Sequence, residues 1–274
     1  MVGSRHEWGP SELYSKDGSL SAELQSTVSD AALKQHQALV YARSFYSYVS
    51  GDYADWSGVE FSADATVHNE VQASALFHHE LRQRVGDLGL ASLSFPIVNE
   101  LDSTLRVGAG SGAPFLPVTL LSADVHGQLT RVRLFQYSVG LGASWWSAGR
   151  RELFLSASGS LWIAGDTQLE LKPYLSWLDS RTTSGRVNVG TSFGVLRGVR
   201  GRAMVDLRLN VGNVPKYVER PLIEKAPSRL AIDGTVSARY WIGDNYGYTA
   251  TLGGGGQLGT FARAGVDCAV FVEL

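Results

Sequence analysis

The sequence predicts an all-β protein, a closed antiparallel transmembrane β-barrel of about 14 strands, with 12 to 16 as the range. Three observations predict it. Apolar and polar residues alternate with a period of two from about residue 38 to the end. Many alternating runs have ten residues or more, whereas strands of globular proteins mostly have about five or six. Aromatic residues gather near the run ends, as they do in the belts that flank a bilayer.

The runs can be followed one by one. In the run 201–212, for example, Val205 and Leu207 share one face and Asp206 and Arg208 share the other. An even number of runs brings both ends of the chain to the same side of the barrel. The connections after the even-numbered runs are the shorter ones, which predicts that this side is periplasmic. The predicted strands are 38–49, 54–67, 70–83, 87–97, 102–111, 116–128, 131–146, 150–163, 166–178, 184–196, 201–212, 228–242, 245–257 and 259–274.

Two regions of the chain differ in composition and in hydrophobic pattern. Residues 1–36 are polar and predict a short N-terminal arm, in which Ser19–Gln37 is the one stretch whose pattern allows a short helix. Residues 37–274 form the predicted barrel, with no second domain. The first residues lack an apolar core, so no signal peptide is visible. The barrel pattern nevertheless predicts the bacterial outer membrane as the location.

Composition excludes several classes of protein. A net charge of −2 argues against a nucleic-acid partner. The single cysteine, Cys268, cannot form an intrachain disulfide. No run of about 18 apolar residues is present, which excludes a transmembrane helix. The main alternative is a large soluble sandwich or propeller, but no blade-length repeat is visible, and the long runs favour a membrane barrel.

Candidate chemistry is sparse, and we expect no enzyme, cofactor or metal. His78 and His79 are adjacent, so in a strand they face opposite sides and cannot hold one metal ion together. A lipase-type pair of His78 with Ser74 or Ser62 is the alternative that the strands allow, but no G-x-S-x-G motif supports it.

The charged residues of the polar face are the candidate lumen lining. Eight acids and eight bases fall on this face, a balance that predicts paired charges along the wall instead of a strongly ion-selective pore. Arg43 is one of the bases. The other predicted lumen residues, with one histidine, are Glu60, Asp64, His78, Glu80, Arg82, Arg106, Asp124, Glu170, Lys172, Arg186, Asp206, Arg208, Asp233, Arg239, Arg263 and Asp267.

Aromatic residues at the run ends are the candidate membrane-interface girdles. The hairpin ARYWIGDNYGYTA is the densest example, because Tyr and Trp flank a tight Gly243-Asp244-Asn245 turn. The predicted interface residues are Tyr46, Tyr48, Trp145, Trp146, Trp177, Tyr240, Trp241, Tyr246 and Tyr248.

Four motifs, taken in order, resemble the YaiO-like outer-membrane β-barrels. They are the Ala54-Asp55-Trp56 strand opening, the Gly108–Pro117 loop (GAGSGAPFLP), the strand LELKPYL over 169–175 and the hairpin RYWIGDNY over 239–246. The resemblance covers most of residues 36–274. It implies an outer-membrane barrel with no established enzymatic activity, sometimes found beside tetratricopeptide modules or polysaccharide-export proteins.

Two functional hypotheses follow. The first is a channel or export component for a polar polymer, a polysaccharide, within an envelope complex. The alternative is a non-conducting structural or docking barrel that anchors a trans-envelope secretion or surface-motility machine. The expected partners are outer-membrane lipids and a periplasmic protein such as a tetratricopeptide module.

Overall fold

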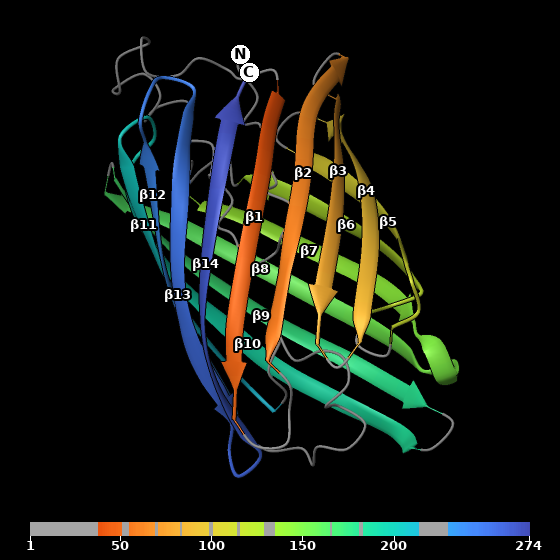
Figure 1. The fold of residues 1–274 in the computed structure, drawn as a ribbon. Helices are drawn as coiled ribbons and strands as arrows, with labels where there is room; N and C mark the ends of the chain where they lie inside the picture. Colours follow the sequence, from red (N-terminus) through yellow and green to blue (C-terminus); the bar gives the residue numbers. More distant parts are fainter. Residues whose placement is uncertain are drawn as a thin grey trace.

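The computed structural model is a closed barrel of fourteen antiparallel strands (Figure 1), which confirms the predicted fold class. The structure describes residues 38–50, 55–68, 71–82, 84–98, 101–113, 116–128, 135–164, 166–180, 183–213 and 230–274. The predicted arm, residues 1–36, lies outside these ranges, and its short helix stays a prediction. The strands are β1 (Ala38–Val49), β2 (Trp56–His68), β3 (Val71–Leu81), β4 (Val85–Val98), β5 (Leu101–Gly110), β6 (Thr119–Gln128), β7 (Phe135–Trp145), β8 (Arg151–Ala164), β9 (Thr167–Ser180), β10 (Thr183–Val199), β11 (Ala203–Gly212), β12 (Ala231–Trp241), β13 (Tyr246–Gln257) and β14 (Phe261–Glu273).

Pairing of the first and last strands closes the barrel. Each strand pairs with its neighbours in sequence, and β1 pairs with β14 from Leu39 opposite Glu273 to Val49 opposite Arg263. Closure leaves no free sheet edge, which is the condition for a sheet to cross a bilayer. β1 begins and β14 ends at the same end of the barrel (Figure 1), which we call the terminal end; the other is the far end.

The predicted runs match the strands within a few residues. β1 has the predicted bounds, whereas β6 begins at Thr119 instead of residue 116. The difference arises because Leu116 belongs to the preceding loop, where it is fully buried and packs with Ala113 against Leu88 of β4. Within the described residues, the helical structure is a short 3-10 helix over Ser147–Gly149, and no helix there is long and apolar enough to span a membrane.

The wall has two chemically different faces. On β11, Val205, Leu207 and Leu209 are exposed on the outside, whereas Asp206 and Arg208 are buried on the inside. Large apolar side chains are exposed in the same alternating way on every strand from β1 to β14. Such an outer surface would be insoluble in water, but it matches the hydrocarbon core of a bilayer.

The ladder between β8 and β9 is interrupted. Paired residues run from Arg151 opposite Asp179 to Ser156 opposite Tyr174, and pairing resumes at Gly159 opposite Leu171. Pro173 lies in this interval and faces outward. A proline has no amide hydrogen to donate to the ladder, which accounts for the gap.

Candidate functional site

The predicted lumen residues lie on the inward face of the barrel. Glu60 of β2, for example, is buried on the inside, whereas its sequence neighbours on the other face are exposed (Phe61) or half-buried (Val59). Strand alternation places the others on the same side, distributed over ten strands and the residue after β3: Asp64 on β2, His78 and Glu80 on β3, Arg82 after β3, Arg106 on β5, Asp124 on β6, Glu170 and Lys172 on β9, Arg186 on β10, Asp206 and Arg208 on β11, Asp233 and Arg239 on β12, Arg263 and Asp267 on β14, and Arg43 on β1.

A first network of charges joins the seam strands. The Arg43 guanidinium donates to Asp267 Oδ2 at 2.7 Å, across the β1–β14 pairing, and lies 3.8 Å from Glu60 Oε1 on β2. The Arg43 and Glu60 side chains are less than one-tenth exposed. One cation therefore links three strands, including the pair that closes the barrel. We call the cluster of Arg43, Asp267 and Glu60, together with His78, Glu80 and Arg82, the seam network.

His78 continues the seam network toward β3. Its Nδ1 lies 3.2 Å from Glu60 Oε2, and its Nε2 lies 3.2 Å from Glu80 Oε2. Glu80 in turn accepts a hydrogen bond from Arg82 Nε at 2.7 Å. The Phe45 ring stacks on the His78 ring with centroids 5.6 Å apart. Each imidazole nitrogen lies within hydrogen-bond distance of a carboxylate, so His78 connects Glu60 of β2 with Glu80 of β3.

A second network lies on β9 and β11. Arg208 Nε donates to Asp206 Oδ2 at 2.8 Å, and its Nη2 lies 3.2 Å from Glu170 Oε2. Lys172 Nζ lies 2.9 Å from the other oxygen of Glu170. Arg208 and Glu170 come from strands separated by β10, where both face Gly194 in the ladder. Glycine there leaves the space in which the two side chains meet.

Two further ion pairs involve inward carboxylates. Arg263 Nη2 lies 3.4 Å from Asp233 Oδ1, between β14 and β12. Glu273, at the end of β14, is buried beside Arg200, whose Nη2 lies 3.1 Å away. The sequence interpretation did not include Glu273 and Arg200 among the candidates. The parity of β14 places Glu273 inward with Asp267, so strand alternation was the signal for it; Arg200 lies in a turn, where alternation does not apply.

Seven of the nine predicted interface aromatics point outward. Tyr240 is 49% exposed and packs beside Tyr248 on the next strand, with ring centroids 5.7 Å apart. The exposed aromatics near the strand ends are Tyr46, Tyr48, Trp145, Trp177, Tyr240, Tyr246 and Tyr248. They contribute to the outer surface where a bilayer interface is expected.

The prediction is wrong for Trp146 and Trp241, which are only 5% and 4% exposed. Each directly follows an outward aromatic residue, so alternation turns it to the opposite side. Trp146 Nε1 donates to Ser144 Oγ at 2.9 Å. Trp241 packs edge-on against Phe271 and its Nε1 donates to Glu273 Oε2 at 3.4 Å.

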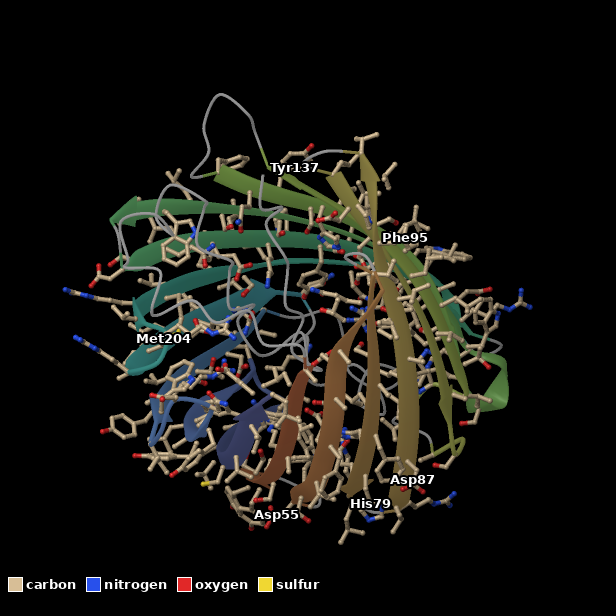
Figure 2. The ribbon with its side chains drawn as sticks, turned by 90° about the horizontal axis from the view of Figure 1, so that it is seen from above. Asp55, His79, Asp87, Phe95, Tyr137 and Met204 are labelled. Atoms are coloured by element: carbon tan, nitrogen blue, oxygen red, sulfur yellow. The ribbon has the colours of Figure 1, made fainter. Side chains whose placement is uncertain are left out.

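The histidine and serine candidates for catalysis contact other residues and show no hydrogen bond to each other in the described part of the chain. Ser74 shares a short hydrogen bond with Ser92, whereas His78 contacts two glutamates. His79 lies on the outer side of the wall beside Asp87, with 2.7 Å between Nδ1 and Oδ1 (Figure 2). In the part of the chain that the structure describes, no group of three or more His, Cys, Asp or Glu side chains could hold a metal ion.

Two exposed carboxylates, Asp55 and Asp166, form hydrogen bonds in connections between strands at opposite ends of the barrel. The Tyr46 hydroxyl donates to Asp55, and this bond, with one from the Val49 amide, lowers the pKa of that carboxyl. The Thr167 hydroxyl and the Arg197 guanidinium lower the pKa of Asp166 in the β8–β9 turn. A lowered pKa means that each carboxylate stabilises the fold above its unfolded pKa, an effect lost as the pH falls through its folded pKa.

Comparison with known proteins places this geometry among membrane barrels. No protein-family model and no curated protein sequence matches the chain. Among solved structures, the CymD monoaromatic hydrocarbon channel aligns with a TM-score of 0.59 at 6% identity, covering 91% of this chain and 92% of that one. A bacterial polysaccharide outer membrane secretin aligns with a TM-score of 0.56 at 9% identity, covering 88% and 100%. An anion-selective porin from Comamonas acidovorans aligns with a TM-score of 0.50 at 10% identity, covering 86% and 98%.

The chain has the fold of the outer-membrane β-barrels. At such low identities the likeness concerns the fold alone. The location follows from the fold together with the closed wall and its apolar outer face, which has no stable place in water. The protein is therefore an integral barrel of the bacterial outer membrane, with lipids in contact with its outer face.

Proposed function

We propose that the barrel is an outer-membrane channel or export component for a polar polymer, a polysaccharide, within an envelope complex. The observation that carries this proposal is the mutual pairing of the inward charges. Arg43, Arg208 and Arg263 each contact a carboxylate of another strand. Charges neutralised in the wall leave a polar surface without a dominant sign, which suits a hydroxyl-rich polymer better than a selected ion.

The comparisons support the proposal at the level of fold. Two of the similar structures are described as a porin and a channel, and a third as a polysaccharide outer membrane secretin. Membership of the YaiO-like family is also a proposal, which rests on the four sequence motifs. We propose no enzymatic role, because His78, the candidate base, lies between Glu60 and Glu80 instead of beside a serine.

Conductance tests the channel. Purified protein added to a planar lipid bilayer should give discrete conductance steps, with cation and anion permeabilities within a few-fold of each other because the wall charges are balanced. Absence of steps from protein that shows heat-modifiable gel migration, and is therefore folded, would contradict the proposal. A deletion strain should also lose surface polysaccharide; normal polysaccharide in that strain would remove the export role.

A docking barrel is the second candidate, and one feature favours it. Inside the terminal end lies an apolar cluster formed by Tyr41, Leu196, Met204, Trp241, Ala269 and Phe271. These side chains are only 2–8% exposed because they pack against one another inside the barrel. An interior that is partly filled by such packing favours a non-conducting barrel over an open channel. Isolation from membranes in mild detergent should then recover a periplasmic protein with the barrel, for which a tetratricopeptide module is the expected type. Recovery of the barrel alone would reject this candidate.

A further inference from the structure

One sector of the inward wall has no charged residue among its own side chains. On β7 the inward residues are glutamine, serine and glycine, and on β8 beyond Glu152 they are serines between two aromatic residues. We call this sector the neutral strip: Gln136, Ser138, Gly140, Gly142 and Ser144 on β7, with Phe154, Ser156, Ser158, Ser160 and Trp162 on β8. The seam network and the β9–β11 network lie on other strands, so the inside of the barrel has two kinds of wall.

The hydroxyls of the neutral strip have capacity for a ligand. Ser138 Oγ and Ser158 Oγ lie 2.6 Å apart across the ladder, and Gln168 donates to Ser160 Oγ at 3.0 Å. A hydroxyl offers one donor and two acceptor lone pairs, so a serine in one such bond retains others. Ser138, Ser156 and Ser158 are half-buried, which leaves part of each accessible from inside.

Aromatic rings lie flat against the wall at this strip. A Cβ added at Gly142 would overlap the Phe154 ring, and one added at Gly190 would overlap the Tyr174 ring, because each ring covers a glycine of the neighbouring strand. Tyr174 is also paired with Ser156. A ring that covers backbone on one face turns its other face inward. Trp162 lies toward the terminal end and is only 5% exposed, whereas Phe154 is half-buried, so Phe154 is the ring of the neutral strip that a ligand can reach.

We infer that the neutral strip is a binding track for an uncharged saccharide segment. Sugar rings combine an apolar C–H face with a rim of hydroxyls, which matches an aromatic face beside serine hydroxyls. This inference rests on the proposed polysaccharide channel and names its substrate class: Phe154 contacts a sugar face, and Ser138, Ser156 and Ser158 contact sugar hydroxyls.

Charge explains why the polymer should be uncharged. Five inward cations already hold carboxylates at 2.7–3.4 Å, namely Arg43, Arg82, Lys172, Arg208 and Arg263. A polyanion would have to break these pairs to bind the five cations. Asp124 of β6 leans over Gly140 at the edge of the neutral strip. Its carboxylate would accept hydrogen bonds from sugar hydroxyls and repel an acidic polymer.

Equilibrium binding to the full-length barrel in detergent tests the track. The probes are maltohexaose and cellohexaose, which are uncharged, and hexagalacturonate, which is acidic. Isothermal titration should show tighter binding of an uncharged probe. The double variant S138A/S158A should weaken that binding roughly tenfold, because two hydrogen bonds are lost. The matched control is S237A/T251V, which removes a hydroxyl pair with a spacing of 2.7 Å between β12 and β13, outside the neutral strip.

Further variants and readouts separate the outcomes. Phe154→Leu should weaken binding and Phe154→Tyr should preserve it, and heat-modifiable migration verifies that each variant folds. The inference is overturned if neither uncharged probe binds, if hexagalacturonate binds as tightly, or if the control variant weakens binding as much as S138A/S158A. Binding does not require conductance, so a barrel that binds but does not conduct contradicts the channel alone. A barrel that conducts but binds no probe contradicts the track alone.

Discussion

Arg43 shows how a charge is held on the inward wall. Its guanidinium is almost fully buried and lies between Asp267 and Glu60, carboxylates that come from the two neighbouring strands. Arg197, by contrast, contacts Asp166 at 3.3 Å with 74% of its side chain exposed. Water and salt screen the second pair, and the first has little of either around it. The two arginines therefore contribute unequally to stability.

Replacement of these two arginines measures the difference. We expect Arg43→Leu to lower the free energy of unfolding by about 3–5 kcal/mol, because the buried Glu60 and the half-buried Asp267 lose their shared cation. Arg197→Leu should cause a much smaller change. Urea unfolding in the presence of lipid vesicles, followed by tryptophan fluorescence, measures both. Equal losses in the two variants would mean that the seam network is not a stabilising element.

At the scale of the element, the two sides of a strand decide what each aromatic residue does. Trp177 and Tyr240 point to the outside, whereas Trp241, the residue after Tyr240, packs against Phe271 inside the barrel. A prediction based on clusters of aromatic letters cannot separate neighbours in this way. Strict alternation, applied residue by residue, does separate them.

Lipid quenching tests this separation. In single-tryptophan variants reconstituted into brominated lipid, we expect strong fluorescence quenching for the protein that retains Trp177 and weak quenching for the one that retains Trp241. The reason is that quenching by bromine requires contact with the acyl chains, which the inward side chain lacks. Quenching of Trp241 as strong as that of Trp177 would contradict its inward placement.

At the scale of the whole molecule, closure depends on one pairing between residues far apart in the chain. Ser44 of β1 lies opposite Cys268 of β14, and both side chains are on the outward face. Tyr46 lies opposite Val266. Directly opposed residues in an antiparallel pair have a Cα separation within the range that a disulfide spans.

Disulfide trapping tests the closure and its register. We expect Ser44→Cys, oxidised with copper phenanthroline in the folded state, to form a disulfide with Cys268. After boiling without reductant, the circularised chain should migrate faster than the reduced one. Tyr46→Cys is the matched control, displaced by two residues, and should remain reduced. A disulfide at Tyr46→Cys with none at Ser44→Cys would show that the register of the seam is different.

Much of the fold could be predicted from the sequence because strand alternation is a local property. The bounds of β1 and the inward placement of Asp206 and Arg208 both follow from a period of two. The partners of these side chains could not be predicted. Arg208 meets Glu170 across the intervening Gly194 because of the stagger among three strands, and stagger has no local signature in the sequence.

The sequence by itself determined that the chain forms about fourteen long strands and which face of each strand is apolar, because neighbouring residues in an extended chain necessarily face opposite sides. The tertiary structure decided the register of β1 on β14, the charge pairs that neutralise the inward wall and the uncharged sector on β7 and β8. These features bring together residues from separate strands, and only the shear of the closed ring fixes which of them meet.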